Sequence, residues 1–571
     1  MPIIANIKRR FLNAAPWLQF AIIAFFAAFF LYPICLAVKE GVMLDGNLSI
    51  YWLKTIFSDP YLMGCLTNSF LLALYTSFAV LVISIPLALL TSGRQFAGRN
   101  ILSGLLLLPL ILPPFVGALS VKRFFAQHGT LNRLLAELGI IDITNAYDWL
   151  GTGFAAVVIL QALHLFPIMY LNLTASLSNL DPMYYEAARS CGSSRLRTFF
   201  RITLPLIRPG IFAGGSIVFI WAFTDIGTPL IFDYNELAAV KIFNELKQSN
   251  IDGSAYGFVI ILLLASVLFY VLGKFIFGKP IKVDSAKASI SADTKKLSPI
   301  ATVFTWLLFI IVIFAAILPH IGVVLTAFSD KWINSVLPES YTIKYIKYAF
   351  TQPQTRTSIL NSIRYASVST LIDIALGTTA AWLIVRSKLK GYRLLDGLMM
   401  LPLAVPGLIL AAGYIALTVI GSPLEKIGPM YNPFWIIVIA YSVRRVPFVV
   451  RGVCSGLEQI PESLEMAAAN LGAGKLKTIW QITTPLISAN IIGAAVLTFS
   501  FAMLEVSDSL VLAQQQAHYP ITKQMYTTLD ASPESINIAA ALGVIGMIIL
   551  GGSMLTASLL MGKRLGAIFR T

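Results

Sequence analysis

The chain contains the stretch Glu186-Ala-Ala-Arg-Ser-Cys-Gly-Ser-Ser-Arg-Leu-Arg-Thr-Phe-Phe-Arg-Ile-Thr-Leu-Pro205. A related stretch begins 280 residues later, from position 186 to position 466, and reads Met466-Ala-Ala-Ala-Asn-Leu-Gly-Ala-Gly-Lys-Leu-Lys-Thr-Ile-Trp-Gln-Ile-Thr-Thr-Pro485. Each stretch predicts two short helices that meet at a glycine, Gly192 or Gly472, because glycine accepts backbone conformations that strain other residues. The proline at the end of each stretch is predicted to end the second helix.

The two stretches belong to an internal repeat that covers most of the chain. The same shift of 280 places Pro167 on Pro447 and Phe219 on Phe499. A shift of 293, from position 108 to position 401, places Leu108-Pro-Leu110 on Leu401-Pro-Leu403. Matching prolines and glycines over long gapless stretches indicate a duplicated unit. The difference between the shifts lies in a longer loop of the first half, near residues 129–149.

The composition indicates a membrane protein. Hydrophobic residues make up 57% of the 571 residues and charged residues only 12%, with a mean hydropathy of +0.79. Soluble domains are about 45–50% apolar and about 25% charged. The net charge of +15 is typical of Lys and Arg gathered in cytoplasmic loops, and no basic run with interleaved aromatics suggests a nucleic-acid partner. The four cysteines form no CxxC pair and indicate neither a disulfide nor a metal site.

Apolar runs of about 20 residues predict twelve transmembrane helices. They cover residues 17–38, 66–91, 100–126, 153–177, 210–233, 256–278, 301–328, 360–386, 394–420, 433–455, 489–513 and 538–561. The fold class is therefore an all-α integral membrane protein of two parallel six-helix repeats. Residues 1–278 form the first half, 279–300 a polar cytoplasmic linker and 301–571 the second half. The distribution of Lys and Arg places both termini in the cytoplasm.

The two loops, residues 181–209 and 461–489, resemble the EAA-type coupling loops of binding-protein-dependent ABC importer permeases. The resemblance extends over nearly the whole chain and looks closest to the fused ferric iron and phosphonate permeases of the type I importer fold. It implies a multi-pass protein of the bacterial cytoplasmic (inner) membrane. It also implies two partners, a cytoplasmic ABC ATPase, expected as a homodimer, and an extracytoplasmic substrate-binding protein.

By this resemblance, the loops dock the ATPase. The residues that match the motif, or stand beside it, are Glu186, Ala187, Ala188, Gly192, Leu204, Pro205, Glu465, Met466, Ala467, Ala468, Gly472 and Pro485. The second loop departs from the pattern, since Met466 occupies the Glu position and Glu465 stands one residue earlier. Unequal coupling by the two loops is therefore expected.

The sequence predicts no enzymatic activity and no catalytic residue. A P-loop requires G-x-x-x-x-G-K-S/T, and the nearest string, Gly472-Ala-Gly-Lys-Leu476, lacks the first glycine and the hydroxyl residue. No cofactor or metal is expected on this chain, and ATP and Mg²⁺ are expected on the partner ATPase. A twelve-helix secondary transporter is the alternative from another class, but it gives no reason for the paired loops.

Ionisable side chains inside predicted spans mark a candidate translocation path, because such groups are costly in a membrane. Arg444 and Arg445 lie within the tenth span, and they contact an anionic group or a fifth-span carboxylate, or else extend to the inner surface. In the fifth spans, Asp225 matches Glu505 under the shift of 280. Gly227 after Asp225 predicts a broken helix, and Asp508 follows Glu505. These carboxylates either border the path or are structural groups bound by hydroxyls and the arginines.

The expected cargo is ferric iron. The Asp-x-Gly-x-Pro string at Asp225 resembles the ferric-iron group of this family, and carboxylates suit a cation. The arginine pair suits an anion instead. The alternative is therefore the same machinery importing a phosphonate, a phosphorylated sugar or another small anion.

Overall fold

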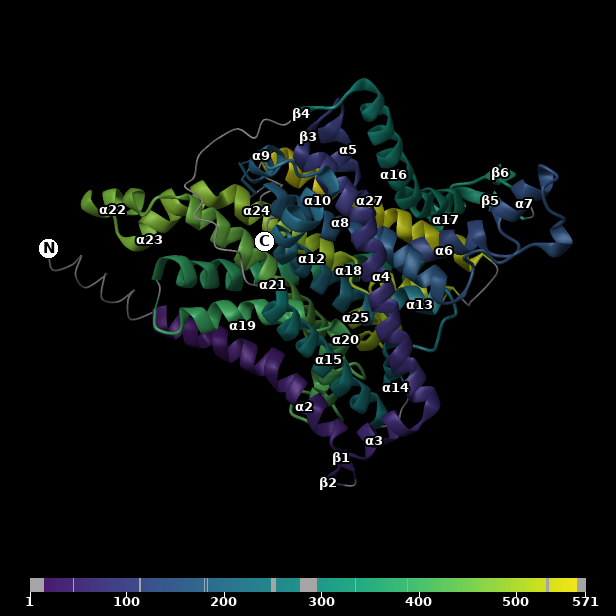
Figure 1. Cartoon of the computed structure of the whole chain (residues 1–571). Helices are drawn as coiled ribbons and strands as arrows, with labels where there is room; N and C mark the ends of the chain where they lie inside the picture. The colour runs from purple at the N-terminus through teal and green to yellow at the C-terminus, as the bar shows by residue number, and fades with distance from the viewer. Residues whose placement is uncertain are drawn as a thin grey trace.

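The protein was analysed as a computed structural model, which describes residues 15–44, 46–111, 114–178, 180–181, 183–247, 253–277, 295–333, 335–387, 389–529 and 534–561. The chain is almost entirely helical, as expected (Figure 1). Most of the predicted linker, residues 279–294, and both chain termini lie outside the described residues.

The first half begins with a helix at Ala15–Gly41 that includes one π-helical turn. Its elements are η1 Ala27–Leu31, α2 Tyr32–Gly41, β1 Met43–Leu44, β2 Asn47–Leu48, α3 Tyr51–Ser58, α4 Pro60–Gly93, β3 Arg94–Gln95, α5 Arg99–Leu105, η2 Leu108–Ile111, α6 Pro114–Phe125, α7 Thr130–Glu137, η3 Ile143–Asn145, α8 Gly153–Ser178, α9 Met183–Ser190, α10 Arg195–Thr198, η4 Phe199–Thr203, α11 Leu204–Leu206, α12 Arg208–Phe223, α13 Gly227–Ile231, α14 Ala238–Leu246 and α15 Gly253–Phe277.

The second half repeats this order. Its elements are β4 Lys295–Lys296, α16 Pro299–Phe328, β5 Ser329–Lys331, β6 Ser340–Tyr341, α17 Lys344–Thr351, α18 Pro353–Trp382, η5 Leu383–Ser387, α19 Tyr392–Ala404, α20 Gly407–Leu417, η6 Glu425–Ile427, α21 Phe434–Gln459, α22 Glu462–Asn470, α23 Lys475–Thr478, η7 Ile479–Thr483, α24 Thr484–Met503, α25 Ser507–Leu512, η8 Gln516–His518, α26 Ile521–Thr528 and α27 Ser535–Met561. The strands form three two-stranded pairs, β1 with β2, β3 with β4 and β5 with β6.

The described residues hold eight helices that are long and apolar enough to cross a membrane, or up to eleven if each of three bent pairs is one span. The remaining expected span, the tenth, corresponds to α21, which is 26 residues long. It is long enough to cross a membrane but is not among the eleven, because the charged side chains of Arg444, Arg445 and Arg451 fall within its apolar stretch. The architecture therefore agrees with an all-α membrane protein of about twelve helices.

Two spans that we expected to be continuous are sharply bent. The third is divided between Arg99–Leu110 and Pro114–Glu137 at 94°, and the ninth between α19 and α20 at 100°. The ninth span breaks at Pro406, whose ring cannot continue the hydrogen-bonding of α19. Repeated prolines thus mark a break that hydropathy alone does not show.

The fifth span of each half is also broken. α12 ends at Phe223 and α13 begins at Gly227, while α24 ends at Met503 and α25 begins at Ser507. The break at Gly227 confirms the prediction made from glycine and proline. The break in the second half has no such signal in the sequence.

The two halves interlock through their first spans. α2 of the first half packs on α20 of the second, and α16 of the second half packs on α6 of the first. The hydroxyl of Tyr414 in α20 donates to the carbonyl of Phe29 at 2.6 Å. A Cβ atom at Gly413 would lie 2.5 Å from the carbonyl oxygen of Pro33, so this crossing requires glycine. The halves therefore share one helical bundle.

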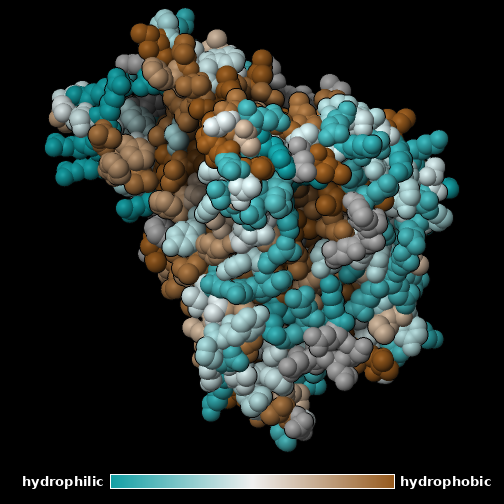
Figure 2. Space-filling view, turned by 90° about the vertical axis from the view of Figure 1, so that its right-hand side faces the viewer, coloured by the Kyte–Doolittle hydropathy of each residue, from teal (hydrophilic) through white to brown (hydrophobic). Residues whose placement is uncertain are grey.

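The outer surface of the bundle is apolar, as lipid contact requires. Large exposed hydrophobic side chains occur along the spans, among them Phe78, Phe275, Phe304, Ile311 and Phe314. Figure 2 shows hydrophobic side chains across the upper left of one face and hydrophilic ones across its lower and right-hand parts. This view looks onto the side of Figure 1 that carries α7, β5 and β6.

Candidate translocation site and coupling loops

A cavity of about 220 Å³ lies between the two halves, beside both fifth-span breaks. The first half contributes Gln161, His164, Trp221 and Asp225 to its wall, and the second half contributes Pro402, Gly407, Arg444, Arg445, Phe448 and Glu505. Four of the six predicted path residues, Asp225, Arg444, Arg445 and Glu505, therefore line one cavity.

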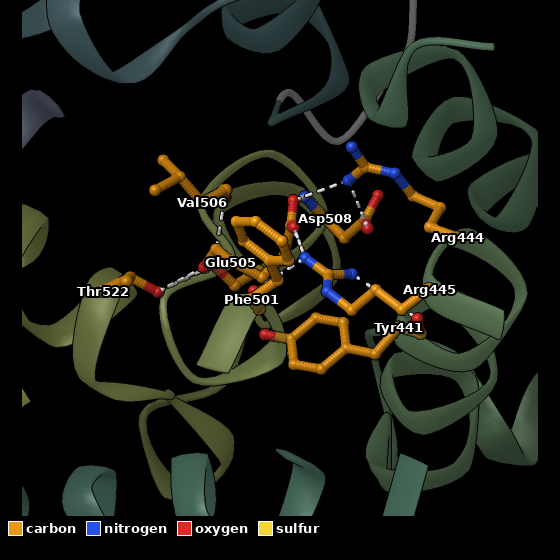
Figure 3. Close-up of polar contacts among 9 residues, drawn as sticks. Tyr441, Arg444, Arg445, Phe501, Glu505, Val506, Asp508 and Thr522 are labelled. Carbon is orange, nitrogen blue, oxygen red and sulfur yellow. Dashed lines mark hydrogen bonds and ion pairs between the residues drawn. The ribbon is translucent and has the colours of Figure 1, made fainter. Parts of the chain in front are cut away.

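In the second half, the charged residues bind one another (Figure 3). Glu505 lies between two arginines of α21, with Oε1 accepting from Nη1 of Arg444 at 2.7 Å and Oε2 paired with Arg445. Nη1 of Arg444 also contacts Oδ2 of Asp508 at 2.9 Å. Asp508 is fully buried, and the side chain of Arg445 is only 6% exposed. The arginines are thus paired inside the bundle and do not extend to its surface.

The network also anchors backbone at the second break. Nη2 of Arg445 donates to the carbonyl of Phe501 at 2.9 Å, and the guanidinium lies 5.2 Å from the centre of the Tyr441 ring. The carbonyl of Glu505 accepts from Thr522 at 2.7 Å. Charged hydrogen bonds of this kind are the stronger class in proteins, so the network fixes the end of α24 against α21 and α26.

In the first half, the matching carboxylate has neutral partners. Oδ2 of Asp225 accepts from Nε2 of Gln161 at 2.9 Å, and Oδ1 accepts from the amide of Gly227 at 3.1 Å. The amide of Thr228 donates to Oδ2 at 3.3 Å. Among the described residues, no Lys, Arg or His forms an ion pair with Asp225 within 4.0 Å. Its partners are therefore two amides at a helix terminus and one side-chain amide.

Gly227 and Asp508 support the cavity without lining it. Gly227 starts α13 and packs closely, since a Cβ there would lie 2.9 Å from the Cβ of Phe115 and 3.1 Å from Val506. Asp508 lies in α25, behind Arg444. Both predicted residues therefore lie at the helix breaks and contact residues of the cavity wall or pack next to them, without facing the cavity.

Sequence reasoning missed three residues of the site. Gln161 is one; the shift of 280 places it on Tyr441, which also faces the network. His164 donates from Nδ1 to the carbonyl of Pro109 at 2.9 Å. Gly407 lies against Arg444, because a Cβ there would meet Nη1 at 2.2 Å. Under the shift of 293, Gly407 corresponds to Pro114 of the first half. The second half thus has a glycine in place of a proline where it also has an arginine that the first half lacks, and this difference could have been noticed in the sequence.

Both coupling loops form two short helices around a glycine, as predicted. α9 and α10 flank Gly192, and α22 and α23 flank Gly472, with φ of 72° and 84° at the two glycines. Asp181 caps α9, since its Oδ1 accepts from the amide of Met183 at 2.9 Å. The positive φ explains why glycine occupies both hinges.

The prediction that a proline ends each second helix is wrong for the second loop, while in the first loop the helix ends at Leu206, one residue after Pro205. The helical run Arg195–Leu206 contains Pro205, and Ile479–Met503 contains Pro485. A π-helical turn, η4 or η7, precedes each proline. The wider turn relieves the contact between the proline ring and the preceding carbonyls. In the first half the chain then bends by 66° before α12.

The two loops expose matching positions. Glu186 and Met466 are both exposed, as are Ala187 and Ala467, while Ala188 and Ala468 are buried. Met466 therefore occupies the place of Glu186, and Glu465 points elsewhere. Leu204 is half-buried, as is its counterpart position 484.

Large apolar side chains surround both exposed positions. Leu196 and Phe200 are exposed in the first loop, and Leu471 and Trp480 in the second. Both loops lie on one side of the bundle, at the upper left of Figure 1, away from β1, β2 and α7. Exposed apolar groups gathered in this way are typical of a protein interface.

No group of three or more His, Cys, Asp or Glu that could hold a metal occurs in the described part of the chain.

Comparison with known proteins agrees with this geometry. The family model of binding-protein-dependent transport system inner membrane components matches residues 81–282 and again residues 373–565. The chain is 27% identical to a ferric transport system permease protein of Actinobacillus pleuropneumoniae, over 84% of this chain and 69% of that protein. It is 22% identical to an Fe(3+)-transport system permease protein of Haemophilus influenzae, over 84% of this chain and 87% of that protein.

A shorter relative matches only part of the chain. The sulfate transport system permease protein of Salmonella typhimurium is 27% identical over 38% of this chain and 76% of its own length. The long relatives thus match both halves, and the two matches to the family model show that the unit occurs twice. The chain belongs to the binding-protein-dependent transport system inner membrane components, as a fused double permease of an ABC importer.

Proposed function

We propose that this permease carries ferric iron through the cavity between its halves, driven by an ATPase that docks on the two coupling loops. The single observation that supports this best is the placement of matched exposed positions, Glu186 and Met466, on one side of the bundle. The cavity lies between the same two halves. A movement of the loops would therefore act on both walls of the cavity.

The docking surface is proposed to centre on Glu186 of α9 and Met466 of α22, together with the exposed apolar side chains Leu196, Phe200, Leu471 and Trp480. Glu186 offers a carboxylate that a basic ATPase residue can bind, whereas Met466 offers only apolar contact. Hydrolysis of ATP is assigned to that partner subunit, and delivery of the cargo to an extracytoplasmic binding protein.

Ferric iron is proposed on two grounds. The long relatives are named as ferric permeases. At the cavity, the two arginines are already neutralised by Glu505 and Asp508, while Asp225 has no ion-pair partner in the described structure. Counted together with Asp508 behind the wall, three carboxyl groups therefore face two guanidinium groups at the cavity, and this excess of one acidic group favours a cation.

The second candidate is a small oxyanion. The match to a sulfate permease favours it, and so does Arg444, whose side chain is 20% exposed beside the cavity. An anion would have to compete with Glu505 and Asp508 for this guanidinium. That competition makes the anion the less favoured cargo.

The test is ATP-driven uptake in liposomes that contain the permease, its co-purified ATPase and its binding protein. Radioactive ferric iron and sulfate are supplied separately. We expect iron uptake that requires ATP and is abolished by Gly192→Pro, since proline cannot adopt the positive φ at this hinge. Sulfate uptake without iron uptake would select the second candidate. Uptake driven by an ion gradient without ATP would contradict the importer assignment.

A further inference from the structure

The second coupling loop has a polar tie to the membrane helices. Arg386 lies in η5, where α18 ends beside α22, and its side chain is only 7% exposed. Its Nε donates to Oε1 of Glu465 at 3.0 Å. Its Nη2 donates to the carbonyls of Leu457 at 3.0 Å and Ile460 at 2.9 Å. One guanidinium thus binds the end of α21 and the first helix of the loop.

Glu465 extends the tie to the second part of the loop. Its Oε1 also accepts from the hydroxyl of Thr483 at 3.1 Å. Arg386 and Glu465 therefore join four segments: η5, the end of α21, α22 and η7. Glu462 lies further from Arg386, at 3.9 Å, and its side chain is 58% exposed. The close contact with Glu465 is the one that holds the loop.

In the described part of the first half, no such tie is seen. By the repeat shifts, Gly93 stands at the position of Arg386, and Tyr185 at that of Glu465. The hydroxyl of Tyr185 meets Thr203 at 3.4 Å, a single long hydrogen bond. The first loop is thus held to its half by a much weaker polar contact.

The backbone differs at the same place. α4 runs as an α-helix to Gly93, whereas α18 passes into the π-helical turn η5 that carries Arg386. π-turns inside α-helices are rare and are frequently found at functional sites. The π-turn and Arg386 thus both distinguish the end of α18 from the end of α4.

We propose that Arg386 and Glu465 form a latch that transmits movement of the second coupling loop to α18. The proposal rests on the proposed function, since the movement comes from the ATPase. Both are positioning residues, because Glu465 faces Arg386 and Thr483, while the exposed Met466, Leu471 and Trp480 form the outer face of the loop. Unequal coupling then has a physical basis: the second loop is rigidly tied to its spans, and the first is not.

The test compares single substitutions that leave the outer face of the loop unchanged. Glu465→Gln removes the charge and keeps the size, and Arg386→Ala removes the guanidinium. Their matched controls are Glu462→Gln, at the exposed acid, and Tyr185→Phe, at the corresponding position of the first half. Each variant is purified with its ATPase and reconstituted, and iron uptake and ATP hydrolysis are measured on the same liposomes.

We expect iron imported per ATP hydrolysed to fall about tenfold in Glu465→Gln and in Arg386→Ala, with the ATPase still co-purifying, because a charged hydrogen bond is lost. The double variant should be no worse than either single one, since the residues act as a pair. Both controls should stay within about twofold of wild type, as exposed or weak contacts contribute little.

A second measurement needs no ATPase. In the permease alone, Glu465→Gln should speed backbone hydrogen exchange in α22 by about tenfold, while Glu462→Gln should not. Unchanged exchange and an unchanged import ratio would overturn the latch. Loss of ATPase co-purification in Glu465→Gln would also overturn it, because Glu465 would then be a docking residue. A wild-type permease that binds no ATPase would instead refute the proposed function, and the exchange experiment would still decide whether the tie exists.

Discussion

The break in the second fifth span is held by four charged side chains, whereas the matched break in the first half is held by one carboxylate and neutral donors. Glu505 and Asp508 bind Arg444 and Arg445, while Asp225 binds Gln161 and two backbone amides. The backbone break and the position of its carboxylate are common to both halves. Their electrostatic partners are not.

The comparison separates what both breaks require, a carboxylate that accepts from the next helix, from what only the second half has, a pair of arginines. In each half the carboxylate accepts from an amide at the start of the next short helix, Gly227 in α13 and Asp508 in α25. A broken helix leaves such amides without partners, so an acceptor is needed at both breaks. The arginines are an addition of the second half, and they leave Asp225 as the carboxylate that faces the cavity without a cation.

The largest expected difference between the breaks is in stability. Glu505→Gln removes the charge between Arg444 and Arg445 and should lower the free energy of unfolding by about 3–5 kcal/mol, because breaking a buried ion pair leaves uncompensated charge. Thermal unfolding of the detergent-solubilised permease, followed by size-exclusion chromatography, measures this. A variant as stable as wild type would show that the network contributes nothing net to folding.

A second difference concerns Lys523 in α26, whose counterpart in the first half is Phe243 under the shift of 280. Lys523 is 5% exposed, donates to the carbonyl of Leu510 at 2.6 Å and lies over the rings of Phe243 and Tyr519. Burial, together with the charge of Lys247, lowers the pKa of Lys523 to about 7. This lysine is therefore a charge-bearing group that only the second half carries at this position.

Between pH 7 and pH 10 the unfolded chain should hold the Lys523 proton and the folded chain should not. Stability should therefore rise with pH in this range, by at most about 1.4 kcal/mol per pH unit, and stay level for this group below pH 7. Lys523→Met should remove this contribution. Thermal unfolding of both proteins across the range is the measurement, and equal slopes would contradict the lowered pKa.

The smallest stability effect is expected at the first break. Asp225→Asn keeps an acceptor for the helix amides and strands no cation, so it should cost only about 1 kcal/mol. Comparison with Glu505→Gln under the same conditions tests the contrast directly. If Asp225→Asn proves as damaging as Glu505→Gln, the two breaks depend equally on charge, and the proposed difference between the halves fails.

Much of the fold could be predicted because its signals are local. Apolar runs located the spans, and the glycines at 192 and 472 marked both hinges. The bends in the third and ninth spans were missed because the hydropathy of a segment says nothing about the direction of its helix axis. Pro113 and Pro406, which match under the shift of 293, were the available signal.

The site was predicted in part. Intramembrane charges pointed to Arg444, Arg445, Asp225 and Glu505, which meet at one cavity. Their mutual pairing depends on how α21 packs against α24, which no spacing in the sequence gives. Gln161 was missed because a neutral amide in an apolar run carries no signal of its own. The tie at Arg386 was missed because it joins residues 79 positions apart.

The charges of α21 also bear on how the protein is made. An isolated helix with arginines near its centre enters a bilayer reluctantly, at a cost of about 2.5–3.5 kcal/mol for each arginine. The carboxylate that pairs with Arg445 is synthesised 60 residues later. Stable placement of α21 in the bilayer is therefore expected to depend on the later arrival of α24 and α25, which makes membrane integration of the second half a cooperative step.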